Sequence, residues 1–299
     1  MMKKKVLLVI SIIIAIFAIG IVVYGIFARP TRKSLDLVEV MKWNQEEIAR
    51  EMKQKLAKLE SRSEERKGIA AEEPVLEEPV LTEEEAVDRG ILIAIDPGHQ
   101  AWEVNMSALE PNAPGSSEMK AKCTSGTSGQ YSGLPEFQLN MDISLQLRTE
   151  LEQLGYQVLL VREDNQTAIS NAERATMASD AGANVYIRIH ANSDNNSSVQ
   201  GALALVSSPG NAYVGHLHNE SYALADTILN AYCVETGFQN RGILQNDTMT
   251  GINWSRVPVM ILEMGFMSNE HDDLAMADSE FQKRMVQGIV NGIEQYFGQ

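Results

Sequence analysis

The C-terminal two-thirds of the chain, residues 90–299, is predicted to fold as one α/β domain. Two features predict it. Short apolar runs, typically ending near glycine, proline or a charged residue, alternate with segments of helical periodicity. The runs are also apolar throughout, as in strands buried on both faces. We therefore expect a mostly parallel sheet with helices on both faces, and the segment is long enough to bury one such core.

The elements follow in order. The predicted strands cover residues 91–95, 157–162, 185–190, 202–206 and 257–263, and the predicted helices cover 137–154, 171–181, 217–234 and 281–297. Ser170 is the predicted N-cap of the second helix, and Glu173 three residues later completes a capping box. Residues 100–135 are rich in Gly, Ser and Pro with little periodicity, which predicts a long loop that is the one candidate for a lid over a site.

The N-terminal third predicts a membrane anchor. Residues 1–5 form a basic tail with Lys3, Lys4 and Lys5, and residues 6–27 contain no charged side chain. At about 1.5 Å per residue such a helix crosses a hydrocarbon core of about 30 Å. The flanking lysines predict a cytoplasmic N-terminus and an extracytoplasmic domain. A cleaved signal peptide is the alternative, but the run is long for one and no clear cleavage site follows.

A stalk and a linker are predicted to connect the anchor to the domain. Residues 28–68 carry apolar residues at helical spacing, which predicts an amphipathic stalk helix. Residues 69–89 are acidic, contain proline and include the repeat EEPVLEEPVL, which is typical of an extended spacer.

Charge and cysteine content narrow the function classes. The chain has a net charge of −15, and residues 91–299 account for 24 acidic against 10 basic residues. Such a domain repels phosphate backbones, so we expect no nucleic-acid partner. The only cysteines are Cys123 and Cys233, which either form a disulfide outside the cytoplasm or remain free.

Four residues suggest a metal-dependent site. His99, His190 and Glu263 each lie at or just past the end of a predicted strand, and Glu136 opens a predicted helix. Ligands beyond the carboxyl ends of neighbouring strands converge on one point. Two imidazoles and one carboxylate leave a fourth zinc position open, as in catalytic rather than structural zinc sites. A further glutamate supplies a proton acceptor.

The same residues lie in motifs that resemble the zinc-dependent N-acetylmuramoyl-L-alanine amidases of the type 3 class. The matching pieces are DPGH at 96–99, the glutamate after a Gly/Ser loop at 136, NAERATMASDAGANVYIRIHANS, the RG at 241–242, and VPVMILEMGFMSN. The resemblance implies a mixed sheet of about six strands flanked by helices on both faces. It also implies zinc ligands His99, Glu136 and His190, with Glu263 as the catalytic glutamate. The implied reaction releases the stem peptide of peptidoglycan by cleaving the amide between the lactyl group of N-acetylmuramic acid and L-alanine.

Three further residues are candidate substrate contacts: Asn192 and Arg241, which lie in the matching motifs, and Arg188. Arg188 departs from the family, which usually has a small residue at this place. On a strand it shares a face with His190. It is therefore a candidate partner for Glu136, Glu263 or a substrate carboxylate, or a structural partner of Asp96 or Asp180. Some family members carry an inhibitory insert after the second histidine, and we expect none here.

Two alternative functions are compatible with the same site residues. One is a different zinc hydrolase of the bacterial envelope, such as a peptidase or deacetylase; another is an inactive wall-binding regulator, although no ligand or base is missing. His216 and His218 do not form a second site in this interpretation, because side chains two residues apart on a helix diverge. The preferred stem peptide, the cellular role and any activating partner stay open.

Overall fold

The computed structural model describes residues 88–298. The predicted tail, anchor and stalk (1–5, 6–27 and 28–68) lie outside the described residues, as does nearly all of the linker 69–89. Within the part of the chain that is described, no helix is both long and apolar enough to cross a membrane. The predicted α/β domain corresponds to the described part.

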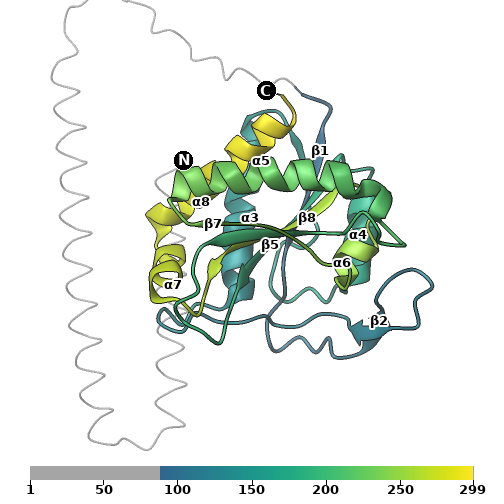
Figure 1. The fold of residues 1–299 in the computed structure, drawn as a ribbon, viewed down its shortest axis with the longest axis horizontal. Coiled ribbons are helices and arrows are strands. Elements are labelled where there is room, and N and C mark those ends of the chain that lie inside the picture. The colour runs from purple at the N-terminus through teal and green to yellow at the C-terminus, as the bar shows by residue number, and fades with distance from the viewer. Residues whose placement is uncertain (1–87, 299) are drawn as a thin grey trace, which may run out of the picture. The chain divides into compact units, whose positions relative to one another are not determined.

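A six-stranded sheet forms the centre of this domain (Figure 1). Its strands are β1 (Leu92–Pro97), β4 (Gln157–Leu160), β5 (Val185–Asn192), β6 (Ala202–Val206), β7 (Asn240–Gln245) and β8 (Val259–Phe266). They lie in the order β4-β1-β5-β8-β6-β7, and all neighbouring pairs are parallel except β6 with β8. The expected mixed, mostly parallel sheet of about six strands is confirmed.

Helices cover both faces of the sheet. The helices are α3 (Glu136–Gln153), α4 (Asn171–Asp180), α5 (His218–Thr236), α6 (Thr250–Asn253), α7 (Glu270–Ala277) and α8 (Ser279–Tyr296). Side chains alternate along β1, so that Ile93 and Ile95 pack with α3, α5 and α8, while Ala94 packs on the opposite face with α4 and α6. The sheet is thus buried on both sides, which explains why its central strands are apolar at nearly every position.

Two strands continue past their predicted last residues, and this changes where two site residues lie. The sequence placed the ends of two strands at residues 190 and 263, but β5 continues to Asn192 and β8 to Phe266. His190 and Glu263 therefore lie inside the strands, directly opposite each other in the pairing of β5 with β8. A register irregularity between His190 and Asn192 follows.

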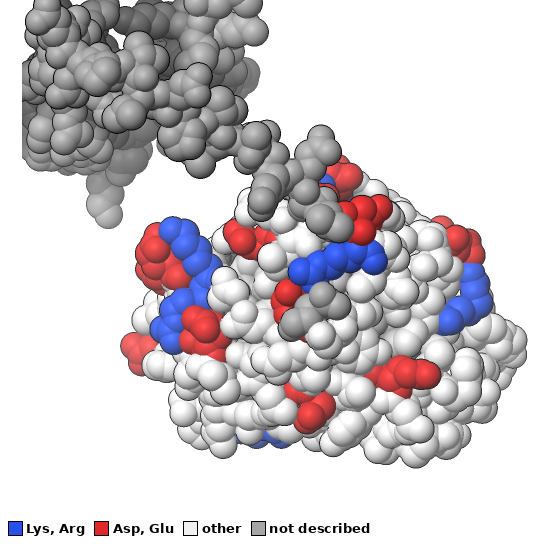
Figure 2. Space-filling view, turned by 90° about the horizontal axis from the view of Figure 1, so that it is seen from above, with Lys and Arg blue, Asp and Glu red and all other residues white. Residues whose placement is uncertain are grey.

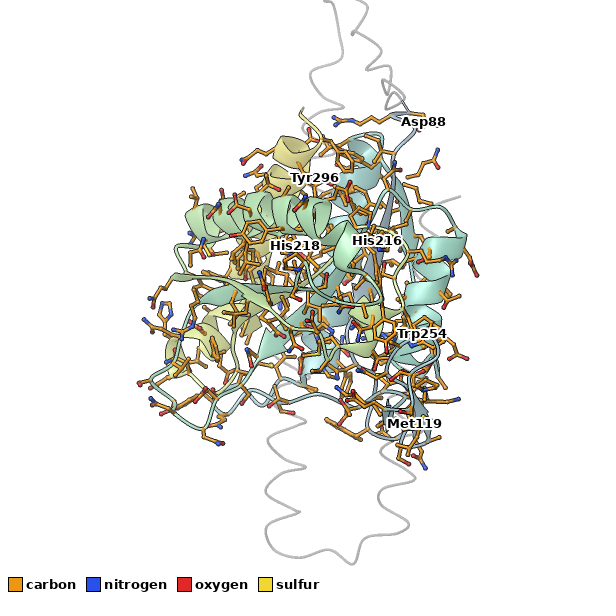
Figure 3. All side chains as sticks on the ribbon, turned by 45° about the vertical axis from the view of Figure 1, so that its right-hand side comes forward. Asp88, Met119, His216, His218, Trp254 and Tyr296 are labelled. Atoms are coloured by element: carbon orange, nitrogen blue, oxygen red, sulfur yellow. The ribbon has the colours of Figure 1, made fainter. Side chains whose placement is uncertain are left out.

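The segment 100–135 contains more structure than predicted. Strands β2 (Leu109–Pro111) and β3 (Met119–Ala121) pair as a short antiparallel hairpin. Trp254 at the end of α6 donates its indole N–H to the Pro111 carbonyl (2.9 Å), which ties the hairpin to the domain. Figure 3 shows Met119 and Trp254 at this end of the molecule.

Charged side chains are scattered on the face shown in Figure 2. Acidic and basic groups lie on a mostly uncharged surface there, and the described residues in that view form no broad basic patch.

Candidate metal centre

Three segments far apart in the sequence bring the predicted ligands together. His99 follows the end of β1, His190 lies in β5, and Glu136 is the first residue of α3. Strands β1 and β5 are neighbours in the sheet, so their carboxyl ends lie side by side. The start of α3 lies against them, with Asn140 one turn into the helix donating to the Gly98 carbonyl (3.3 Å).

The three ligand atoms form a nearly equilateral triangle. His99 Nε2 lies 3.1 Å from Glu136 Oε1 and 3.1 Å from His190 Nδ1, and His190 Nδ1 lies 3.3 Å from Glu136 Oε1. Tetrahedral zinc with bonds of about 2.0 to 2.1 Å holds its ligand atoms roughly 3.3 Å apart. The donor set and its spacing therefore fit a zinc ion.

Thr124 holds the His99 ring in the orientation that a metal ligand needs. His99 Nδ1 lies 3.1 Å from the Thr124 carbonyl oxygen and 3.0 Å from its hydroxyl. The carbonyl accepts only, so Nδ1 carries the proton and Nε2 presents its lone pair to the other two ligands. The His99 backbone adopts φ +63°, an uncommon conformation for a residue other than glycine.

Glu136 is buried, and its surroundings stabilise the charged form of its carboxyl group. Its Oε1 accepts the Ala191 backbone N–H (3.1 Å) and its Oε2 accepts that of Thr127 (2.9 Å). Burial raises the pKa of this carboxyl, but its interactions with the His190 and His99 imidazoles outweigh burial and hold the pKa well below its usual range. Burial also lowers the pKa of His190 to about 4, so this ring is neutral at pH 7, as a ligand must be.

Two glycines give these side chains room. A Cβ on Gly98 would lie 2.3 to 2.6 Å from three atoms of the His190 ring. A Cβ on Gly126 would lie 2.4 Å from Glu136 Oε2, and the backbone there has φ +76°, which glycine adopts freely. Any larger residue at either place would displace a ligand.

A buried ion cluster supports the turn that carries His99. Asp96 Oδ1 accepts from Arg174 (2.7 Å), and Oδ2 accepts from Arg188 Nε and from the Tyr186 hydroxyl (both 2.8 Å). Burial would raise the pKa of Asp96, but the Arg174 and Arg188 guanidinium groups hold it well below its usual range. Arg174 also donates to the His99 carbonyl (3.0 Å), so the cluster fixes the turn directly.

Arg162 supports the same turn from the other side. It donates to the carbonyls of Pro97 (2.7 Å) and Gly98 (2.9 Å) and to that of Phe137 in α3 (3.2 Å). The turn after β1 is thereby tied to the first residues of α3, where Glu136 lies.

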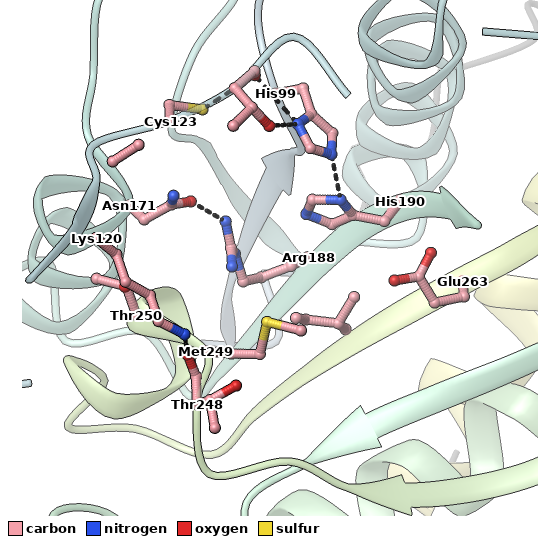
Figure 4. Close-up of a pocket in the computed structure, with 13 residues that line it drawn as sticks. His99, Lys120, Cys123, Asn171, Arg188, His190, Thr248, Met249, Thr250 and Glu263 are labelled. Atoms are coloured by element: carbon pink, nitrogen blue, oxygen red, sulfur yellow. Dashed lines mark hydrogen bonds between the residues drawn. The ribbon is translucent and has the colours of Figure 1, made fainter. Parts of the chain in front are cut away.

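A pocket of about 250 Å³ opens beside the three ligands (Figure 4). His99, His190 and Glu263 line one end of it. Burial, together with the Glu136 carboxylate, raises the pKa of Glu263 to about 8 in the metal-free site, and Arg188 opposes this shift. A cation bound at the ligand triangle would lower this pKa and favour the carboxylate, which is the form that can accept a proton. Glu263 thus lies next to the ligand triangle, but it is not one of the group whose atoms converge.

The candidate substrate residues lie in different surroundings. Arg188 lines the pocket and pairs with Asp96 rather than with Glu136 or Glu263, while Asp180 pairs with Arg256. Asn192 and Arg241 are absent from the lining of this pocket. Arg241 lies over the Phe266 ring at 5.4 Å, and a substrate contact by Asn192 or Arg241 stays a prediction.

Cys123 lines the pocket beside the ligands, while Cys233 and the remaining histidines do not. His216 and His218 are at the beginning of α5 (Figure 3), where His218 Nδ1 bonds the Ser207 carbonyl (2.7 Å). Cys123 and Cys233 are both buried free thiols, which answers the open question of their pairing for this structure.

Several residues of the site were missed in the sequence. Thr124, Lys120 and Cys123 come from the predicted loop 100–135, and Thr248, Met249 and Thr250 come from the segment before and within α6. The Gly/Ser-rich loop was the only signal for the first group, and it did not single out residues. The expected lid segment is in fact a wall of the pocket.

Comparisons with known proteins agree with this fold. The profile of the family Amidase_3, N-acetylmuramoyl-L-alanine amidase, matches residues 93–295. The crystal structure of the N-acetylmuramyl-L-alanine amidase Ami1 from Mycobacterium smegmatis has a TM-score of 0.63 and 26% identity, covering 70% of this chain and 97% of that one. The catalytic domain of CwlV, an amidase from Bacillus (Paenibacillus) polymyxa, has a TM-score of 0.56 and 26% identity, covering 70% of this chain and 98% of that one.

Sequence relatives include amidases of very different length. The N-acetylmuramoyl-L-alanine amidase Rv3717 of Mycobacterium tuberculosis is 25% identical over 75% of this chain and 93% of its own. LytC of Bacillus subtilis is 27% identical over 55% of this chain, but the match spans only 32% of LytC. The fold and the site define an α/β domain with a candidate metal site made of two histidines and one glutamate. The chain belongs to the N-acetylmuramoyl-L-alanine amidase family.

Proposed function

We propose that this protein is a zinc-dependent peptidoglycan amidase that cleaves the bond between the lactyl group of N-acetylmuramic acid and L-alanine. Family membership supports the reaction class. The observation that carries the metal dependence is the triangle of His99 Nε2, Glu136 Oε1 and His190 Nδ1, with sides of 3.1 to 3.3 Å. Zinc in such a site acts as a Lewis acid toward the amide carbonyl and the attacking water.

The protein's own contribution to the reaction is the movement of a proton. Glu263 lies across the pairing of β5 and β8 from His190, at the end of the pocket where the ligands converge. We assign it as the general base that accepts a proton from water and returns it to the departing amine. Water thereby adds hydroxyl to the lactyl carbonyl and hydrogen to the alanine nitrogen, so the reaction consumes one water and releases no net proton from the enzyme.

Fixed polar groups keep the ligands in place during this reaction. Thr124 fixes the tautomer of His99, and the backbone N–H groups of Ala191 and Thr127 fix the Glu136 carboxylate. Such second partners commonly account for 10- to 100-fold in metal affinity or activity. The ligand positions therefore need little rearrangement when the metal binds.

We also propose that the protein acts outside the cytoplasm, held by residues 6–27. The support is the uncharged apolar run and the lysines that precede it. This location would bring the domain to its polymeric substrate. Fractionation of cells tests it: the full chain is expected in the membrane fraction and accessible to external protease, and recovery in the cytosol would contradict the proposal.

Digestion of purified peptidoglycan tests the reaction. Zinc-loaded protein is expected to release new alanine N-termini without new reducing sugar ends, and Glu263→Gln is expected to release neither while retaining zinc. New reducing ends would indicate a glycosidase, and free acetate would indicate a deacetylase. An active Glu263→Gln would refute the assigned base.

A further inference from the structure

The pocket beside the metal ligands has a second, cationic end. Lys120, Asn171 and Arg188 line it together with Thr248 and Thr250, away from Glu263 (Figure 4). Its volume of about 250 Å³ is below the roughly 300–1,000 Å³ of sites for drug-sized ligands. A short extended group fits this space better than a disaccharide does.

Arg188 is held in the pocket wall with hydrogen-bonding capacity left over. Its side chain is 4% exposed, its Nε donates to Asp96 and its Nη2 donates to the Asn171 side-chain oxygen (2.7 Å). Among the described residues, Nη1 has no hydrogen-bond partner. A guanidinium group carries five N–H donors and cannot lose its charge, so one that lines a pocket with a donor left over attracts an anionic partner.

Asp96 alone does not balance the two guanidinium groups that contact it. Asp96 is shared between Arg174 and Arg188, each with its side chain almost fully buried, and its two oxygens are already occupied by three donors. One carboxylate therefore faces two guanidinium groups, and the excess positive charge lies on the pocket side, where Arg188 is part of the lining. Buried charges are costly unless they are paired.

Lys120 adds a second cation to the same end of the pocket. Its ammonium group donates to the Thr248 carbonyl, which brings the β2–β3 hairpin to the segment before α6. The ammonium group has three donors and only part of them are used, with Glu118 at 3.7 Å in a partly exposed pair. Gly251 in α6 makes room for the guanidinium, because a Cβ there would lie 2.2 Å from Arg188 Nη1.

We propose that Arg188 and Lys120 form a carboxylate-binding subsite that selects stem peptides with a free carboxylate close to the scissile amide. This inference rests on the proposed function, since the ligand triangle at the other end of the pocket sets where the amide lies. The chemistry recognised is a peptide α-carboxylate on the second stem residue, as opposed to the uncharged carboxamide at the same position. Arg188 supplies a planar pair of donors and Lys120 a point charge.

Binding of two released peptides tests the subsite. The probes are L-alanyl-γ-D-glutamate with a free α-carboxylate and its α-carboxamide counterpart, both with blocked C-terminal extensions, titrated into the full-length protein by calorimetry. Wild type is expected to bind the carboxylate at least tenfold more tightly. Lys120→Met is expected to lose at least fivefold of that affinity, and to change the affinity for the carboxamide less than twofold. Arg188→Met is expected to remove the preference.

The matched control is Lys283→Met, which removes an exposed cation on α8 that pairs with Glu280 (2.7 Å). It is expected to keep the full preference. Equal binding of both peptides by wild type, or an unchanged preference in Lys120→Met, would overturn the subsite. The test does not depend on Arg188→Met, because Lys120→Met alone decides it if Arg188→Met fails to fold. Retained discrimination in a protein that digests no peptidoglycan would instead support the subsite and refute the proposed function.

Discussion

Asp96→Asn is the substitution that tests the buried ion cluster most sharply. The change keeps the shape of the side chain and removes its charge, leaving Arg174 and Arg188 without their shared counter-ion. Breaking a buried pair in this way costs about 3–5 kcal/mol of unfolding free energy. Because Arg174 also holds the His99 carbonyl, the variant is expected to bind zinc at least tenfold more weakly.

The pH dependence of the loss in unfolding free energy shows whether that loss comes from the charge of Asp96. The folded-state pKa of Asp96 is depressed, so its contribution is present above the unfolded value of 3.8 and is lost as pH falls below it. Integrating the proton linkage from pH 5 to pH 3 gives a loss of about 1.1 kcal/mol in wild type that Asp96→Asn does not share. The stability difference between the two proteins is therefore expected to shrink by about 1.1 kcal/mol over this range.

Urea unfolding of both metal-free proteins at pH 5, 4 and 3 measures this difference. Other carboxylates titrate equally in both proteins and cancel in the comparison. A difference that stays constant from pH 5 to pH 3, or a cost at pH 7 below about 1 kcal/mol, would contradict the assignment of Asp96 as a charged hub.

Three further substitutions separate chemistry, metal binding and packing. Glu263→Gln is expected to lower kcat by about 10²- to 10⁴-fold with unchanged zinc content, measured by digestion and elemental analysis; a loss of zinc instead would make Glu263 a ligand. Gly98→Ala places a Cβ within 2.3–2.6 Å of the His190 ring, so it is expected to lower the zinc affinity at least tenfold. Competition with a chelator measures this affinity, and an unaltered value would contradict the close approach. Gly292→Ala places a Cβ 2.4 Å from Ile228 Cα between α8 and α5, so it is expected to cost about 1–3 kcal/mol in urea unfolding while leaving zinc affinity unchanged. A stabilised Gly292→Ala would show that helix propensity outweighs this contact.

The central strands were predictable because they are buried on both faces. A strand covered on both sides reads as an apolar run. Strand β6 and the first four residues of β1 have this form, and β5 and β8 are apolar apart from polar residues such as Arg188, His190 and Glu263. Strand β7 escaped notice because NRGILQ lies at the edge of the sheet and is mostly exposed or half-buried. The three-residue strands β2 and β3 are too short for a periodic signal.

The ligand residues were predictable from their place, but their supports were not. His99 follows a recognisable strand, His190 lies near the end of one and Glu136 opens a helix, and motif resemblance assigned their roles. The partner of Arg188 depends on register, since Asp96 and Arg188 lie directly opposite each other in the pairing of β1 with β5. Nothing in the local sequence distinguishes Asp96 from Asp180 as that partner. Lys120 was likewise hidden, because a loop without periodicity gives no orientation for its side chains.

X-ray absorption at the zinc edge tests the central claim most directly. The zinc-loaded full chain is expected to bind one zinc per chain, with two imidazole ligands and oxygen ligands at about 2.0–2.1 Å and no sulfur at about 2.3 Å. His190→Ala is expected to lose one imidazole signal and most of the bound metal. A sulfur ligand, or full zinc occupancy in His190→Ala, would contradict a centre built from His99, Glu136 and His190.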